Sequence, residues 1–312
     1  HLDIPLNGEL VTAKGEVTLR NNSLFIKPLD STLKNLSGKF SFINGDLQSE
    51  PLTASWFNQP LNVDFSTKEG AKAYQVAVNL NGNWQPAKTG VLPEAVNEAL
   101  SGSVAWDGKV GIELPYHAGA TYNVELNGDL KNVSSHLPSP LAKPAGEPLP
   151  VNVKVDGNLN SFELTGQAGA DNHFNSRWLL GQKLTLDRAI WAADSKTLPP
   201  LPEQSGVELN MPPMNGAEWL ALFQKGAAES VGGAASFPQH ITLRTPMLSL
   251  GNQQWNNLSI VSQPTANGTL VEAQGREINA TLAMRNNAPW LANIKYLYYN
   301  PSVAKTLGDS TP

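Results

Sequence analysis

The sequence predicts a mostly β protein: a long antiparallel sheet that must curl, with two or three short helices. Three observations lead to this fold class. Gly and Pro account for 26 and 23 of the 312 residues, and 30 more are Asn, a residue typical of turns and strand ends. Charged residues are only 16%, below the roughly 25% of soluble domains. The third observation is that apolar and polar residues alternate over most of the chain.

Alternation with a period of two is the pattern of a strand with one apolar and one polar face. In the segment from Tyr74 to Leu80, apolar side chains at even positions alternate with Gln75, Ala77 and Asn79. The same pattern recurs around Val124, Val153 and further along the chain. Each of these segments is therefore expected to be a strand that leaves one face in water.

Turn signals that favour a positive φ separate many of these strands and predict hairpins, hence antiparallel pairing. They are Asn44-Gly45, Asp107-Gly108, Asn127-Gly128, Asp156-Gly157 and Asn267-Gly268. A parallel β-helix is disfavoured, because parallel neighbours need crossover connections rather than tight turns.

Helix signals are few. A short helix is expected from Pro93 to Leu100, with proline suited to its first turn. A second is expected from Gly216 to about Lys225, where Asn215 is an N-cap candidate with Glu218 three residues later. A third short helical turn is expected after Pro301.

The chain is expected to be one elongated β section, residues 1–312, of a longer protein. Its β blocks span about 1–134, 149–225 and 237–300, with connectors at about 135–148 and 226–236 that are rich in Pro or in Gly and Ala. About fifteen to eighteen strands would make a flat sheet roughly 75 Å wide, so the sheet must bend. It either closes into a sandwich or barrel, or it curls into a trough.

Composition excludes several function classes. A net charge of −5 without a cationic block gives no footprint for nucleic acid. The absence of Cys excludes disulfides and thiolate chemistry. The longest apolar runs, such as Trp219 to Phe223, are five residues, whereas a spanning helix needs about 18 to 20.

No catalytic motif emerges. The five His show no metal-ligand spacing, and the Asp171–His173 segment is interpreted as a polar turn rather than a cation site. Gly102 to Lys109 has the wrong glycine spacing for a phosphate-binding loop and is interpreted as a hairpin. Glu113 and Glu125 could form a carboxylate pair, but the sequence does not single them out. No catalytic residue, metal site or cofactor is therefore predicted.

Several segments resemble the AsmA-like envelope proteins of Gram-negative bacteria. They are Leu36–Leu47, Leu52–Leu61, Ser135–Pro144, Gly216–Leu222 and Ala288–Tyr299, which together bracket nearly the whole chain in family order. The resemblance implies a non-enzymatic, bridge-like lipid transfer protein with a periplasmic β-rich body and an inner-membrane anchor. It also implies that the long antiparallel curled sheet forms an elongated apolar groove, so that residues 1–312 are a single elongated β-groove section. The implied partners are phospholipid acyl chains, the rest of the parent protein, and the inner and outer membranes through regions outside this chain.

On this interpretation one face of the strands lines a lipid groove that contributes to outer-membrane integrity. The expected lining residues are Phe40, Phe42, Leu52, Trp56, Leu61, Val63, Phe65, Val76, Val78, Leu80, Tyr122, Val124, Leu126, Val151, Val153, Val155, Ile241, Leu243, Leu258, Ile260, Ile278, Leu282 and Met284. Two alternatives stay open at this point. One is a non-catalytic structural or adhesive β-sandwich scaffold of the envelope, and the other is an all-β carbohydrate-active enzyme.

Overall fold

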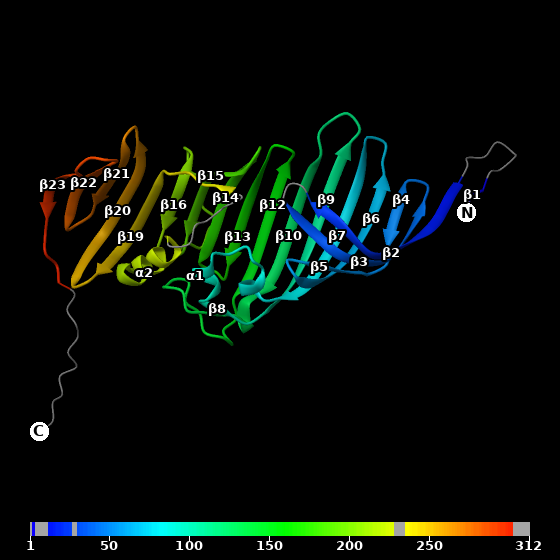
Figure 1. Cartoon of the computed structure of the whole chain (residues 1–312), viewed down its shortest axis with the longest axis horizontal. Helices are drawn as coiled ribbons and strands as arrows, with labels where there is room; N and C mark the ends of the chain where they lie inside the picture. Colours follow the sequence, from blue (N-terminus) through cyan, green and yellow to red (C-terminus); the bar gives the residue numbers. More distant parts are fainter. Residues whose placement is uncertain (1, 4–11, 27–29, 228–234, 302–312) are drawn as a thin grey trace, which may run out of the picture.

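The computed structural model describes residues 2–3, 12–26, 30–227 and 235–301. Within them the chain forms one 21-stranded sheet and a separate two-stranded sheet. Figure 1 shows the strands following one another along the long axis of the molecule, from β2 at one end to β23 at the other. The predicted mostly β class with a large curled sheet is confirmed.

The elements fall into three stretches of the chain. The first comprises β1 (Leu2–Asp3), β2 (Thr12–Ile26), β3 (Ser31–Ile43), β4 (Asp46–Ser49), β5 (Leu52–Trp56), β6 (Gln59–Glu69), β7 (Ala73–Trp84), β9 (Val104–Pro115) and β10 (Thr121–Asp129). The second comprises β12 (Pro150–Asn158), β13 (Ser161–Ala168), β14 (Asn172–Leu180), β15 (Leu184–Ala192), β16 (Gly206–Asn210), β17 (Met214–Asn215) and β18 (Ala235–Ser236). The third comprises β19 (Ile241–Leu250), β20 (Gln253–Thr265), β21 (Gly268–Gln274), β22 (Ile278–Arg285) and β23 (Leu291–Leu297).

Most neighbouring strands pair antiparallel, as predicted, but the middle of the sheet differs. There β15, β16 and β19 are adjacent and parallel. Parallel neighbours require a crossover connection. Residues 193–205 form the first crossover and the segment that contains α2 (Gly216–Ala227) belongs to the second. The turn signals did not reveal this break, because both connections are long.

Two of the five predicted turns are confirmed as hairpins. Asn44-Gly45 joins β3 to β4, and the turn near Asn267-Gly268 joins β20 to β21. At the second turn Thr265 pairs with Gly268, so the two loop residues are 266 and 267.

The other three predicted turns are wrong, because Gly108, Gly128 and Gly157 lie inside strands β9, β10 and β12. Each glycine leaves room for a large neighbour. A Cβ on Gly108 would lie 2.6 Å from Cδ2 of Leu126, and one on Gly157 would lie 2.6 Å from Cβ of Phe162. These glycines therefore serve cross-strand packing rather than a reversal of the chain.

Replacing Gly268 with alanine is expected to destabilise the protein. Its φ is +152°, which disfavours L side chains, and the added Cβ would overlap the carbonyl oxygen of Met284. The expected loss is about 1–3 kcal/mol of unfolding free energy, measured by denaturant unfolding. Gly251→Ala is the matched control, since Gly251 has a φ of +60° but nothing within 4 Å of its added Cβ. An equal loss for both variants would contradict the packing argument.

The helices lie along one long edge of the sheet (Figure 1). The first predicted helix is α1 (Glu94–Asn97), shorter than expected, and it lies near β8 (Leu100–Ser101) and β11 (Ser134–Ser135), which pair with each other. The 3-10 turns η2 (Pro86–Lys88) and η3 (Leu130–Asn132) belong to the same region. The helical turn expected after Pro301 lies outside the described residues.

The second predicted helix, α2, is confirmed together with its cap. Oδ1 of Asn215 accepts a hydrogen bond from the Ala217 amide at 3.1 Å, while its Nδ2 donates to Oε1 of Glu218 at 2.9 Å. The Trp219 indole donates to the carbonyl of Ser139 at 3.0 Å, and Lys225 contacts Glu98. The helix is thus attached to the 135–148 connector and to the region of α1.

A buried carboxylate fastens the C-terminal end of the sheet. Glu277 accepts hydrogen bonds from the backbone amide of Asn256 at 2.6 Å, from Nδ2 of Asn256 at 2.7 Å and from Nδ2 of Asn300 at 3.0 Å. Burial by itself raises the pKa of Glu277, but these hydrogen bonds outweigh it and hold the pKa below its ordinary value of 4.5. Glu277 therefore ties the segment that follows β23 back to β20.

Candidate functional site

Strand register shows which side chains share a face, because directly paired residues project to the same side of a sheet. One row of paired residues crosses almost the whole sheet. It consists of Leu52, Val63, Leu80, Gly108, Leu126, Val153, Gly166, Phe174, Trp191, Leu209, Leu243, Ile260, Ala273 and Ala280. The first row therefore joins strands β5 to β22 on one face.

A second row runs beside the first on the same face. It consists of Phe65, Val78, Val110, Val124, Val155, Leu164, Ser176, Ala189, Val207, Ile241, Ser262, Val271, Leu282 and Ala292. Neither row contains a charged residue. We call the face that carries the two rows the lining face, and its opposite the outer face.

The structure places all of the predicted lining residues on the lining face. Most are members of the two rows, and most of the others lie two residues from a member on the same strand, as Tyr122 does from Val124. Trp56 lies four residues from Leu52 in β5, and Phe40 and Phe42 lie in β3. The Phe40 ring lies 5.7 Å from that of Phe65, so β3 contributes to the same face. Burial raises the pKa of the Tyr122 hydroxyl, since its ring lies among these apolar side chains.

Sequence reasoning missed several residues of this face. Val110 and Ile112 in β9 were overlooked because Asp107-Gly108 was interpreted as a turn, although both valine and isoleucine alternate with polar neighbours. Other members that were missed include Phe162, Leu164, Phe174, Trp178, Trp191 and Leu209. The same period-two alternation in β13 and β14 could have found several of them.

The outer face is polar. Its rows pair Asn81 with Asp107, Asp107 with Asn127, and Asn127 with Asn152. Glu125 lies on this face opposite Lys109, whereas Glu113 lies opposite Thr121. The two carboxylates therefore have different cross-strand partners and project to the outer face rather than into a shared cleft.

Exposure differs along the lining face. In β7, β9, β10 and β12 the apolar members of the two rows are half-buried, whereas a second layer packed on them would bury them. At the β3–β6 end, Leu61 is buried and packs with Leu33 and Ala54. The described residues thus leave the central stretch of the lining face without a covering layer.

Aromatic side chains close one edge of the lining face near that packed end. The rings of Trp56 and Phe57 are 4.9 Å apart, and those of Trp84 and Trp106 are also 4.9 Å apart. The Trp84 indole donates to the carbonyl of Pro60 at 2.7 Å. This cluster anchors the edge from which η2 and α1 extend.

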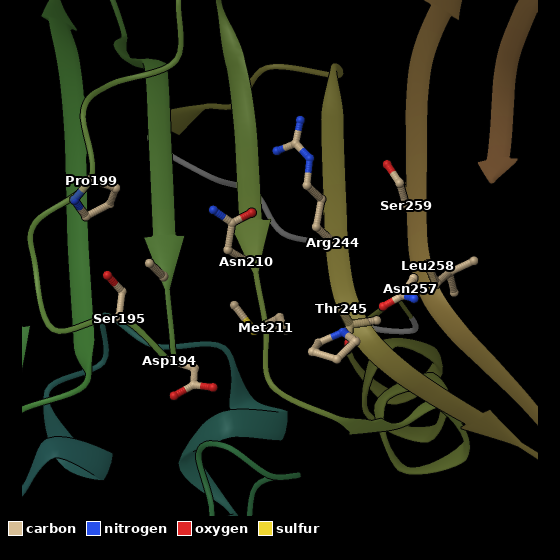
Figure 2. Close-up of a pocket in the computed structure, with 12 residues that line it drawn as sticks. Asp194, Ser195, Pro199, Asn210, Met211, Arg244, Thr245, Asn257, Leu258 and Ser259 are labelled. Carbon is tan, nitrogen blue, oxygen red and sulfur yellow. The ribbon is translucent and has the colours of Figure 1, made fainter. Parts of the chain in front are cut away.

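A hollow of about 590 Å³ lies on the outer face, beside the first crossover (Figure 2). Asn210, Arg244 and Ser259 contribute to it from three adjacent strands, and Asp194 and Pro199 contribute from the crossover. Nη1 of Arg244 lies 3.4 Å from Oε2 of Glu208. The register places Asn210, Arg244 and Ser259 on the face opposite the two apolar rows.

Polar groups beside this hollow hold the crossover in place. Nδ1 of the buried His173 lies 2.7 Å from the carbonyl oxygen of Ser195, and Nδ2 of Asn175 donates to the carbonyl of Pro199 at 3.0 Å. Arg188 donates to the carbonyls of Pro202 and Glu203. In the part of the chain that the structure describes, no three His, Asp or Glu residues gather as they would around a metal ion.

The register and burial define the class of protein: a long β-sheet with one continuous apolar face and one polar face. No helix among the described residues is long and apolar enough to cross a membrane. The chain belongs to the YhdP protein family, whose model matches residues 1–312. The resemblance inferred from the sequence is confirmed.

The chain is 98% identical over 312 residues to the intermembrane phospholipid transporter YhdP of Escherichia coli (strain K12). The match covers 100% of this chain and 25% of that protein. The chain therefore spans about a quarter of the length of this curated relative. No solved structure matches it.

Proposed function

We propose that this chain is a section of a periplasmic lipid conduit, in which the lining face shields acyl chains of phospholipid moving between the inner and outer membranes. The parent protein is anchored in the inner membrane and the transfer contributes to outer-membrane integrity. The observation that carries the proposal is the pair of uncharged rows, half-buried over β7 to β12. The name of the relative from Escherichia coli supports it.

The energetics favour such a surface. Exposing a 16-carbon chain to water costs about 0.8 kcal/mol per methylene, or on the order of 12 kcal/mol. Contact with the lining face offsets this cost. In the second row Val78, Val110, Val124 and Val155 follow one another, so successive positions offer the chain nearly equal contacts. A lipid can therefore slide without falling into a deep trap.

The conduit needs no chemistry on the headgroup. A polar headgroup stays hydrated at the open side of the lining face, so no dedicated ligand is required. Transfer by shielding makes and breaks no covalent bond, and the proposed section is not an enzyme.

Photocrosslinking from four consecutive positions of β7 tests the proposal. Val76 pairs with Ile112 and Val78 with Val110 on the lining face, whereas Gln75 and Ala77 are exposed on the outer face. Probes at Val76 and Val78 of the full-length protein in cells are expected to form lipid adducts, with little or no adduct from the other two positions. Equal labelling from all four positions, or none, would contradict the assignment of the lining face.

Lipid is also expected to co-purify with the protein under mild, detergent-free preparation. Organic extraction followed by mass spectrometry measures it. If extraction of the purified protein yields no phospholipid, the shielding proposal is contradicted.

A further inference from the structure

Part of the lining face is buried over β14 and β15, although Phe174 and Trp191 of the first row stay half-buried there. Register places Ser176, Ala189 and Leu186 on this face, yet they are exposed by only 0%, 2% and 6%. On the N-terminal side Val155 and Leu164 are half-buried, and on the C-terminal side Ile260 and Leu282 are half-buried again. In the second row, two half-buried, open stretches are therefore separated by a buried, closed one.

Aromatic rings cluster on the lining face at the closed stretch. The rings of Phe162 and Trp178 stack with centroids 6.0 Å apart, and the ring of Phe237 meets Trp178 edge-on at 6.3 Å. We call these three residues the aromatic cluster. They come from β13, from β14 and from the residue after β18, so three segments converge on one point of the lining face.

Two features position the aromatic cluster. Nε1 of Trp178 donates to Oγ of Ser176 at 2.9 Å, and that hydroxyl donates to the carbonyl of Leu164 at 3.1 Å. The Trp178 indole therefore lies over Ser176, two residues earlier in β14. Strand β18 pairs in parallel with the start of β15, Leu184 with Ala235, so Phe237 follows directly beside Leu186.

The members of the cluster differ in how firmly they are held. Trp178 has a hydrogen bond and two ring neighbours, whereas Phe237 is 60% exposed and contacts one ring of the cluster. An exposed ring with a single aromatic contact is displaced more easily than a hydrogen-bonded indole. Phe237 is therefore the movable member, and Trp178 the fixed one.

We propose that the aromatic cluster is a gate in the conduit, which a lipid opens by displacing Phe237 as its acyl chains pass from the β7–β13 stretch to the β19–β22 stretch. This inference rests on the proposed function. It assigns control of passage to one point of the lining face, while the two open stretches only shield the chains.

The test uses the full-length protein in cells with a photocrosslinking probe at one of three positions: Val155 before the gate, Leu186 beneath it, or Ile260 beyond it. In the otherwise unchanged protein, lipid adducts are expected from Val155 and Ile260, with markedly fewer from Leu186. Phe237→Ala is expected to raise the Leu186 adduct by about two- to tenfold, the population shift that follows from losing one aromatic contact. Tyr299→Ala, an exposed aromatic at the far end of the chain, is the matched control and should leave it unchanged.

A second measurement avoids a probe at the buried Leu186. Phospholipid transfer by the full-length protein carrying Phe237→Ala is compared with that of Tyr299→Ala, and faster transfer only in the first variant is expected. The gate is refuted if Leu186 labels as strongly as Val155 in the unchanged protein, or if Phe237→Ala changes neither labelling nor transfer. Absence of lipid adducts from Val155 and Ile260 would instead refute the conduit itself.

Discussion

A single aspartate at Val124 is expected to block phospholipid transfer by the full-length protein, whereas an aspartate at the adjacent Asn123 leaves transfer intact. Val124 is a half-buried member of the second row, between Val110 and Val155. A carboxylate at this position either keeps its hydration shell or loses it at a cost of several kcal/mol. In both cases the apolar path is interrupted. Since each 1.4 kcal/mol changes a rate about tenfold, transfer should fall at least about tenfold.

The two substitutions are closely matched. Both add one negative charge at consecutive positions of β10, but on opposite faces, since Asn123 is exposed on the outer face. Transfer between the two membranes and accumulation of the protein are measured together in cells. Val153→Asp is expected to behave like Val124→Asp. Normal transfer by Val124→Asp would refute the conduit, and failure of that variant to accumulate would favour a role in the packed core.

Replacing Glu277 with alanine is expected to give the largest loss of stability at the C-terminal end of the sheet. The change leaves the Asn256 amide and the side chains of Asn256 and Asn300 without their acceptor. Hydrogen bonds to a buried charged group contribute about 1.5–3 kcal/mol each, not additively, so a loss of about 3 kcal/mol is expected. Hydrogen exchange of the β20 and β22 amides measures it. Glu272→Ala, at an exposed position of β21, is the control and should change little.

The same carboxylate makes this end of the sheet sensitive to acid. The pKa of Glu277 is lower in the folded protein than its ordinary value of 4.5, so the unfolded chain binds the proton more readily. The stabilisation is complete above about pH 4.5 and disappears as the pH falls through the lower, folded pKa. Glu277→Gln should lack this loss of stability on acidification. An identical pH profile for both proteins would contradict the role assigned to Glu277.

The sequence predicted individual strands better than their arrangement. Alternation in segments such as Tyr74–Leu80 reports a local property, the division between an apolar and a polar face. The parallel pairing of β15, β16 and β19 depends on which distant strands become neighbours, and no local turn signal encodes that. The capped helix α2 was predictable because the Asn215 cap and the helix are contiguous in the sequence.

The candidate site was predictable in the same limited way. Period-two alternation identified an apolar side of each strand. Only the strand register shows that Val63, Val153 and Leu243 belong to one row. Three of the five aspartate-glycine and asparagine-glycine pairs gave wrong turn predictions, because glycine serves packing as well as turns. Ser176 could not be identified as a covered position, since a serine in a strand gives no sign of the rings that will surround it.

Most strands of this sheet bond only to strands close to them along the chain. Folding can therefore spread strand by strand from several starting points, as in repeat proteins, without distant segments having to find one another. The parallel pairings among β15 to β19 depart most from this pattern, because they must wait for long connections. A destabilising substitution in one hairpin should consequently unfold only the neighbouring strands. This architecture therefore tolerates substitutions that would unfold a compact globular domain as a whole.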